Sequence, residues 1–194
     1  MTSTNTAARI PPLQPPYEPE VAHDLERLMP PGYDPLLLFR TVAHNPRVLR
    51  RMRKGGLLDA GSIEPVEREL VILRTTARCG SEYEWGVHVA FFAGRVGLSS
   101  AHVAATVSGT PDDPVWTREQ ALLVRLCDAL HEGSTVPEPL FAELRAVWSA
   151  AQLVELVMLV GLYHAISMMT NALALPSEPG APRFDAHAGS VHEG

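Results

Sequence analysis

Three ionisable side chains within residues 64–97 have a spacing suited to proton transfer. Glu84 and His88 are four residues apart, so on a helix they would lie one turn from each other on the same side. Glu69 lies beside the apolar stripe of the preceding segment, where it would point into the crevice between two helices. A histidine titrates near neutrality, and a carboxylate neighbour can orient it and hold its proton. We therefore expect Glu69, Glu84 and His88 to surround one pocket as an acid–base site.

Two helices must position these side chains, and the sequence marks the break between them. Pro65 suits a first helical turn and Gly80 a stop, and apolar residues recur between them at helical spacing, at Val66, Leu70, Leu73 and Ala77. Ser81 followed three residues later by Glu84 fits a capping box, which predicts that a second helix starts almost at once.

Each of the three candidates also has a plainer structural interpretation, and all of these stay open at this point. Glu84 would then only cap its helix, alone or in addition to a chemical role. His88 would be a hydrogen-bonded core histidine beside Phe91 and Phe92. Glu69 would pair with Arg68 or Arg74 at the surface.

The same residues carry a resemblance to a known family. A Glu, then polar or Cys positions twelve and fifteen residues on, then a His four further on, resembles the active-site helix pair of the carboxymuconolactone decarboxylase and alkyl hydroperoxidase D-like (AhpD-like) family. Here these positions are Glu69, Ser81, Glu84 and His88. The run RCGSEYEWGVH is similar to that of many decarboxylase-like members, including the preceding Cys79. The resemblance covers roughly residues 35–175.

The resemblance implies two kinds of chemistry. In the redox branch the two middle positions are the cysteines of a CxxC that cycles between dithiol and disulfide, whereas this chain has Ser81 and Glu84 there. Acid–base chemistry by the matching Glu and His is therefore the leading hypothesis. A one-cysteine peroxidase is the alternative, because Cys79 precedes a helix start and adjoins Arg78, which both lower the pKa of a thiol. A non-catalytic oligomeric binding protein of the same fold is the third.

The family name implies a decarboxylation, which leaves charge delocalised onto the carbonyl of a small carboxylated or lactone-like substrate. Protonated His88 would stabilise that oxygen or return a proton to carbon, with Glu69 or Glu84 keeping it charged. Arg74 or Arg78 would hold a substrate carboxylate. The remaining candidates for substrate-binding positions or pocket walls are Ser81, Tyr83, Trp85, Tyr163 and His164.

Composition excludes several other classes of function. A net charge of −6 argues against non-specific nucleic-acid binding. The histidines at 23, 44, 102 and 131 are scattered and no HxxxH or CxxC occurs, so we expect neither a metal nor another cofactor. Two cysteines, Cys79 and Cys127, favour a reducing compartment. The first twenty residues lack the apolar segment of a secretory signal, so we expect a cytoplasmic location.

The chain divides into three parts by composition. Residues 1–19 form a proline-rich arm, either loose or wrapped on a neighbouring subunit; residues 20–176 form the helical domain; and residues 177–194 form a flexible tail. One basic cluster, over residues 47–54, suits a solvated helix end, with an anion site as the alternative.

The helical domain shows no period-two alternation, so we expect an all-α bundle of seven or eight helices. The last segment, 153–175, is apolar nearly all round, which predicts a helix buried in the bundle or in a subunit interface and not one that crosses a membrane, since it contains Glu155, His164 and Asn171. The resemblance implies the AhpD-like fold and a homo-oligomer, a trimer or a multiple of it.

Overall fold

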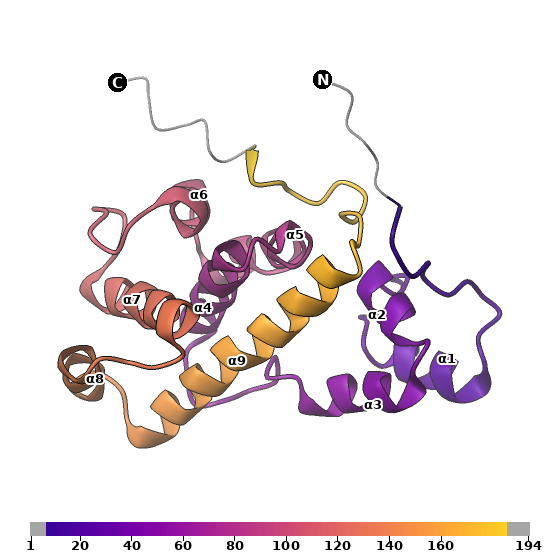
Figure 1. Ribbon diagram of the computed structural model, residues 1–194, viewed down its shortest axis with the longest axis horizontal. Helices are drawn as coiled ribbons and strands as arrows, with labels where there is room; N and C mark the ends of the chain where they lie inside the picture. The colour runs from indigo at the N-terminus through magenta and orange to yellow at the C-terminus, as the bar shows by residue number, and fades with distance from the viewer. Residues whose placement is uncertain (1–6, 186–194) are drawn as a thin grey trace.

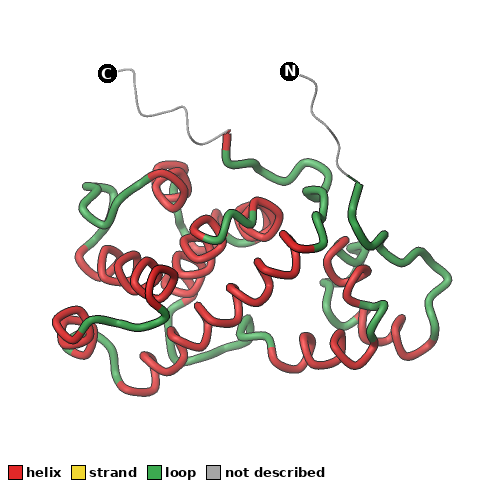
Figure 2. The backbone as a smooth tube through the Cα atoms, in the orientation of Figure 1, coloured by secondary structure: helices red, strands yellow, loops and turns green. Residues whose placement is uncertain are grey.

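The computed structural model describes residues 7–185, which contain nine α-helices, one 3₁₀ helix and no strand (Figures 1 and 2). The all-α prediction is confirmed, although the α-helices outnumber the seven or eight expected. Their bounds are α1 Pro19–Glu26, α2 Leu37–Val42, α3 Pro46–Gly55, α4 Pro65–Arg78, α5 Glu82–Phe91, η1 Ala93–Val96 (3₁₀), α6 Ser100–Ser108, α7 Arg118–Gly133, α8 Glu138–Arg145 and α9 Ala150–Ala172.

Two helices, α4 and α9, form the centre of the molecule. α4 packs against α5, α6, α7 and α9, and α9 also contacts α5 and α8. In Figure 1, α9 runs diagonally, with α4 to α8 on one side and α1 to α3 on the other. Four consecutive residues of α4, from Leu70 to Leu73, are fully buried, which means that every side of this helix is covered.

Side-chain caps mark the first residues of several helices. Capping boxes form at Ser99, Thr117 and Ser149, where α6, α7 and α9 begin. The capping box predicted at Ser81 is wrong, because this side chain accepts no bond from the first turn of α5. α2 begins at Leu37 without a side-chain cap.

The junction between α4 and α5 is a three-residue turn, residues 79–81, that fixes both helices. Gly80 has a positive φ of 63°, which a residue without a Cβ adopts without strain, and it directly follows the C-cap Cys79. The Ser81 hydroxyl is buried 2.8 Å from the Thr170 hydroxyl of α9. α5 is thereby tied to α9 at its N-cap residue, and Glu84 is not engaged in capping.

α9 is less completely buried than its composition suggests. Its inner side is buried, but an apolar stripe remains exposed at Val154, Val157, Met158 and Met168. Among the described helices, only α9 has the length and hydropathy of a membrane span. Its inner side packs in the protein core against α4 and α5, so the expected central position is confirmed and the expected near-complete burial is not.

The N-terminal arm, in its described part 7–18, lies on its own chain and is not loose. The Arg9 amide donates to the carbonyl of Leu173 at 2.8 Å. The Leu13 amide donates to the Arg40 carbonyl at 3.2 Å, and the Arg40 Nε atom donates to the Leu13 carbonyl at 2.8 Å. The prolines of this segment remove backbone donors, so the arm is held by a few specific bonds and by apolar packing of Leu13 and Tyr17 on the core.

The C-terminal segment also docks, so the predicted flexible tail does not hold for residues 177–185, and residues 186–194 lie outside the described part. The Phe184 ring packs edge-on against Trp85, 5.2 Å between centroids. A Cβ placed on Gly86 would come within 2.5 Å of the Pro182 carbonyl oxygen. Glycine at 86 is therefore what lets this segment cross α5 at close range.

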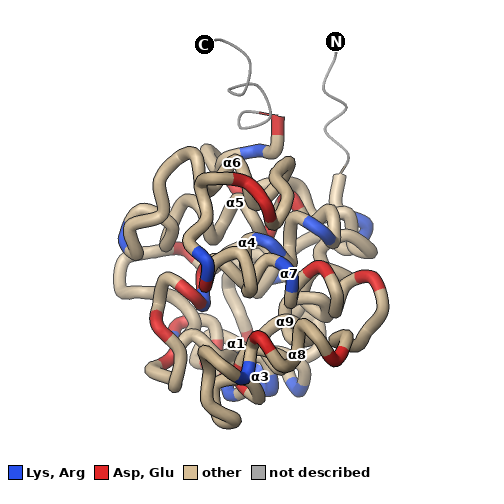
Figure 3. The backbone as a smooth tube through the Cα atoms, turned by 90° about the vertical axis from the view of Figure 1, so that its left-hand side faces the viewer, with Lys and Arg blue, Asp and Glu red and all other residues tan. Residues whose placement is uncertain are grey.

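The basic cluster at residues 47–54 lies on α3, and part of it is neutralised by α1. Arg50 binds Glu20 at 2.8 Å, and Arg53 binds the buried Asp24 at 2.7 Å. Figure 3 shows basic residues gathered near α3, while charges of both signs are spread over the rest of that face. The pairing supports the interpretation of a helix end that is partly solvated and partly engaged in holding α1.

Candidate active site

A buried histidine on α5 lies between two carboxylates and a tyrosine. The His88 Nδ1 atom is 2.7 Å from Glu69 Oε2 of α4, and Nε2 is 3.0 Å from the Tyr163 hydroxyl of α9 and 3.5 Å from Glu84 Oε1. All four residues are buried. The three side chains expected to meet do meet, and α9 adds a fourth that sequence spacing did not assign to proton chemistry.

Glu69 is the inner member of the group. It is fully buried, which excludes the interpretation of a surface ion pair, although the Arg68 Nε atom also contacts its second carboxylate oxygen at 3.3 Å. With Oε2 on His88 Nδ1 and Oε1 near a guanidinium, Glu69 fixes the orientation of the imidazole ring. His88 is consequently directed with its other nitrogen away from α4.

Glu84 is the outer carboxylate. Its Oε1 lies near His88, while Oε2 is buried without a hydrogen-bond partner among the described residues. Burying an unpartnered carboxylate oxygen is costly, so such an atom marks a place where a ligand or water would be accommodated. The interpretation of Glu84 as a mere helix cap is wrong, since the cap predicted for it does not form.

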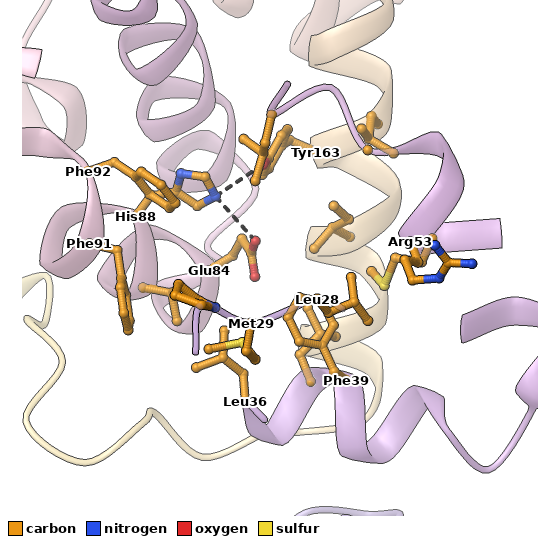
Figure 4. Close-up of a pocket in the computed structure, with 18 of the residues that line it drawn as sticks. Leu28, Met29, Leu36, Phe39, Arg53, Glu84, His88, Phe91, Phe92 and Tyr163 are labelled. Carbon is orange, nitrogen blue, oxygen red and sulfur yellow. Dashed lines mark hydrogen bonds and ion pairs between the residues drawn. The ribbon is translucent and has the colours of Figure 1, made fainter. Parts of the chain in front are cut away.

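These groups open onto a cavity of about 440 Å³. His88, Glu84 and Tyr163 line one wall (Figure 4), and dashed lines there join His88 to the other two. The rest of the cavity lining is mostly apolar, and includes Leu28, Met29, Leu36, Phe39, Phe91, Phe92 and Ile166. A largely apolar cavity with a few convergent polar groups has the composition of a small-molecule site.

Basic side chains also reach this cavity, and these were not among the predicted site residues. Arg27, Arg53, Lys54 and Arg95 contribute to its lining. Arg53 is already paired with Asp24, and no ion pair engages the other three within residues 7–185. The basic residues of α3 were visible in the sequence. That they line the same cavity as residues of α5 depends on long-range packing, which no local pattern encodes.

The pKa of His88 is raised to about 9 by its surroundings. Burial acts to lower it, but the hydrogen bonds to Glu69 and Glu84 and the charges of the two carboxylates outweigh burial. His88 is therefore an imidazolium at neutral pH. Tyr163 has a pKa raised well above its usual value, by burial and then by the charges of Glu84 and Glu69, so it remains a neutral phenol.

The two arginines predicted to bind substrate are used elsewhere in the structure. Arg74 is buried and binds Asp128 of α7 through two bonds of 2.8 Å, and its remaining nitrogen contacts carbonyls at the end of α6. Arg78 pairs with Asp128 at 3.3 Å and with Glu132 at 2.8 Å. Neither lines the cavity, because both lie on the side of α4 that faces α7.

Three of the predicted pocket residues serve the core instead. Ser81 bonds to Thr170, and the Trp85 indole donates to the Thr106 hydroxyl at 3.0 Å. The Tyr83 hydroxyl donates to Glu178 and accepts from the Leu38 amide. All three point away from the cavity because alternate positions of α5 face α9, α6 and the C-terminal segment.

Cys79 and His164 lie together outside the cavity. The Cys79 Sγ atom is 3.7 Å from His131 Nδ1, which is 3.2 Å from His164 Nε2. Burial raises the pKa of the half-buried Cys79 thiol, and a hydrogen bond from Ser167 opposes this only partly. The expected lowering by Arg78 is wrong, because Arg78 is neutralised by Asp128 and Glu132.

The fold is all-α, and the site holds a buried histidine between two carboxylates beside a cavity. Residues 44–124 match the sequence model of the Carboxymuconolactone decarboxylase family. The resemblance drawn from residues 69–88 is thereby confirmed over this part of the chain. No curated protein sequence matches the chain.

Solved structures support the same fold. An uncharacterised peroxidase-related protein from Silicibacter sp. TM1040 is 15% identical, with a TM-score of 0.75 over 97% of this chain and 98% of that one. The debrominase Bmp8, a cysteine-to-alanine variant in complex with 2,3,4-tribromopyrrole, is 18% identical, with a TM-score of 0.71 over 91% and 94%. An Agrobacterium tumefaciens protein of unknown function, proposed as the antioxidant defence protein AhpD, is 20% identical, with a TM-score of 0.56 over 66% and 84%.

Proposed function

We propose that this protein is an acid–base enzyme, a carboxymuconolactone decarboxylase-like lyase that acts on a small carboxylated or lactone-like substrate. The observation that carries the proposal is the His88 imidazolium, held by Glu69 at 2.7 Å and facing the cavity between Tyr163 and Glu84. A general acid needs a proton at the operating pH and a fixed position beside the reacting atoms. His88 meets both conditions.

Each of the four residues has a separate role in the proposed decarboxylation. When carbon dioxide leaves, the carbon–carbon bond breaks and its electron pair is delocalised onto the substrate carbonyl oxygen as an enolate. His88 Nε2–H donates to the Tyr163 oxygen, which leaves the phenol hydrogen free to bond to that enolate oxygen. His88 then gives its proton to carbon, directly or through Glu84, and regains one from solvent. Glu69 keeps the imidazole oriented throughout and favours its return to the charged form.

The cavity's composition supports the substrate class. Its apolar lining fits a small unsaturated or cyclic carbon skeleton, and the unpaired cations Arg27, Lys54 and Arg95 favour an anionic group. These residues replace Arg74 and Arg78 as the proposed carboxylate partners. Low dielectric around His88 and Glu84 strengthens each of these interactions, since the apolar wall limits the water in the site.

The peroxidase alternative has weaker support. It rests on Cys79, whose pKa is raised by burial and not lowered, so that less thiolate is present at neutral pH. Cys79 also lies outside the cavity. The observation in its favour is the neighbouring His131, 3.7 Å from the sulfur, which offers a proton acceptor. A non-catalytic binding protein would use the unpartnered Glu84 oxygen to bind its ligand, but would not need the proton held on His88.

An oligomer remains part of the proposal. The exposed stripe of Val154, Met158 and Met168 on α9 is the apolar surface that supports a homo-oligomer, since such stripes are usually covered by a partner. A trimer or a multiple of it is expected from the family resemblance alone. Sedimentation velocity of the wild type and of Met158→Glu tests this, with a single dissociated species expected for the variant.

The lyase proposal is tested by incubating the protein with a panel of unsaturated lactone carboxylic acids in deuterated water. We expect carbon dioxide release and one deuterium bound to carbon in the product. His88→Ala should lower turnover by about 10²- to 10⁴-fold, the usual contribution of a positioned general acid. His102→Ala, a histidine that only caps α6, serves as the matched control and should leave turnover unchanged.

Two results would overturn the proposal. One is turnover that survives His88→Ala. The other is peroxide consumption with dithiothreitol that is lost in Cys79→Ser and retained in His88→Ala, which would make the protein a one-cysteine peroxidase.

A further inference from the structure

A second group of ionisable side chains lies outside the cavity and takes no part in the proposed acid–base chemistry. It consists of Cys79 at the end of α4, His131 in the last turn of α7, and His164 in the middle of α9. The three potential donor atoms lie within 4.8 Å of one another, and each residue is partly exposed. They come from parts of the chain up to 85 residues apart, and none of the local spacings is that of a metal motif.

The distances agree with a tetrahedral metal site. Zinc binds thiolate sulfur at about 2.3 Å and histidine nitrogen at about 2.0–2.1 Å, so ligands at a tetrahedral angle would be about 3.6 Å apart for sulfur and nitrogen and about 3.3 Å for two nitrogens. The Sγ of Cys79 is 3.7 Å from His131 Nδ1, and this nitrogen is 3.2 Å from His164 Nε2. Two of the three distances thus match the edges of a coordination tetrahedron, and the third pair, Cys79 Sγ and His164 Nε2, lies within 4.8 Å.

The hydrogen bonds around the group leave the Nε2 atom of His164 free to act as a metal ligand. His164 Nδ1 lies 2.9 Å from the Val160 carbonyl oxygen and must donate its hydrogen there, which leaves Nε2 with a free lone pair. A metal-binding histidine usually donates the hydrogen of its other ring nitrogen to an acceptor such as a backbone carbonyl. The Asn171 side chain donates to the Cys79 carbonyl at 2.8 Å, which holds the cysteine in place.

Without a metal, no protonation state lets all three side chains bond to one another within the group. If His131 Nδ1 carries a hydrogen, it donates to His164 Nε2 and leaves the Cys79 thiol no acceptor there. If Nδ1 is bare, it accepts from the thiol but faces the lone pair of His164 Nε2 at 3.2 Å, which is repulsive. A divalent cation resolves the conflict, because it accepts all three lone pairs at one point.

We propose that Cys79, His131 and His164 form a binding site for a divalent cation of the zinc type. The ligand set of one thiolate and two imidazoles favours zinc, with cobalt as a spectroscopic substitute, over magnesium or calcium, which require oxygen ligands. A water molecule completes the tetrahedron from the exposed side. The nearby Arg78 does not oppose the ion strongly, since Asp128 and Glu132 pair with it.

Such an ion would clip together α4, α7 and α9, the helices that also carry or support the acid–base group. Its binding free energy would add to the stability of the fold, since the unfolded chain does not hold the three ligands together. This role is independent of the decarboxylation proposal. The ion lies outside the cavity, so its loss lowers stability and does not remove any group from the reaction.

The test is titration of reduced, chelator-treated full-length protein with Co²⁺, followed by competition with Zn²⁺. We expect one Co²⁺ per chain, visible d–d bands of a tetrahedral site and an ultraviolet thiolate-to-cobalt band, all displaced by Zn²⁺. Zn²⁺ should also raise the melting temperature. Cys79→Ser should abolish the thiolate band, and His164→Ala should weaken binding at least about 100-fold, because changes around ligands alone cost 10- to 100-fold.

Cys127→Ala and His102→Ala serve as matched controls, because they remove the other cysteine and a histidine outside the group. Both should bind Co²⁺ like the wild type. The proposal is overturned if the wild type shows no stoichiometric tetrahedral Co²⁺ spectrum, a result that needs no variant to fold. It is equally overturned if circular dichroism shows Cys79→Ser and His164→Ala to be folded and the Co²⁺ spectrum is unchanged in them.

Discussion

The two histidine groups on either side of α4 show how partners decide the chemistry of the same residue type. His88 is almost fully buried, and two carboxylates raise its pKa to about 9. His131 is half-buried, and its pKa is lowered by burial and then by the nearby His164 and Arg78. Burial opposes the charged form in both places, so the neighbours decide the outcome. One group holds a proton, and the other offers lone pairs.

The comparison also separates the two hypotheses that the sequence left open. The family spacing placed Glu69, Glu84 and His88 together with Cys79 in one stretch of twenty residues. In the structure the turn at Gly80 separates them: Glu84 and His88 line the cavity, Glu69 lies behind His88, and Cys79 faces α7 and α9. Two groups of side chains are therefore found where the sequence indicated one.

The largest expected effect comes from removing the inner carboxylate. Glu69→Gln preserves shape but replaces the charged partner of His88, at 2.7 Å, by a neutral amide, and breaking a buried ion pair costs about 3–5 kcal/mol of unfolding free energy. Urea unfolding followed by circular dichroism measures this. Glu143→Gln, in the exposed pair with Arg125, is the matched control and should have a small effect. Equal losses in both variants would contradict the structural importance given to Glu69.

The next effect is a dependence of stability on alkaline pH. The folded-state pKa of His88, about 9, exceeds its ordinary 6.5, so its contribution is fully present below pH 6.5 and is lost as the pH rises through 9. The 2.5-unit difference corresponds to roughly 3 kcal/mol. Unfolding free energies measured from pH 6.5 to 10 should fall in the wild type and less in His88→Gln. Parallel profiles would show that the histidine is not held charged.

A smaller effect distinguishes the two carboxylates. Glu84 lies 3.5 Å from His88 and Glu69 lies 2.7 Å away, so Glu84→Gln should lower the pKa of His88 less than Glu69→Gln does. The Glu84→Gln protein should unfold at nearly the wild-type urea concentration, because one oxygen of Glu84 has no partner to lose. Turnover of a lactone acid should nevertheless fall by about 10²-fold. Wild-type turnover with reduced stability would reverse the assigned roles.

The smallest expected effect lies at the other group. Arg78 is one of the charges that lower the pKa of His131, so Arg78→Gln should raise it. NMR titration of the His131 ring in metal-free protein measures the shift. Arg95→Gln is the control, because Arg95 is not among the groups that act on His131. A pKa of His131 that stays unchanged in Arg78→Gln would show that burial and His164 alone determine it.

Local patterns predicted the helices and part of the site. The break at Gly80 is encoded by adjacent residues and is found where expected. The triad of Glu69, Glu84 and His88 was predictable because helical spacing and family spacing coincide. The protonation of His88 was predictable in direction, since a carboxylate neighbour was expected.

What depends on long-range packing could not be predicted. The partners of Arg74 and Arg78 lie on α7, more than fifty residues away, and no local pattern distinguishes the α7 side of α4 from its cavity side. Docking of residues 177–185 on α5 depends on the close approach at Gly86. The contacts of Cys79 with His131 and His164 likewise require the finished bundle, so the sequence showed only scattered histidines.

The measurement that tests the central claim most directly is an NMR titration of the His88 ring in the wild-type protein. An imidazolium held by Glu69 and Glu84 predicts that its carbon and proton shifts stay those of the charged form at pH 7 and change only near pH 9. Loss of the high titration point in Glu69→Gln would identify the cause. A midpoint at or below 6.5 in the wild type would contradict a protonated general acid at this site.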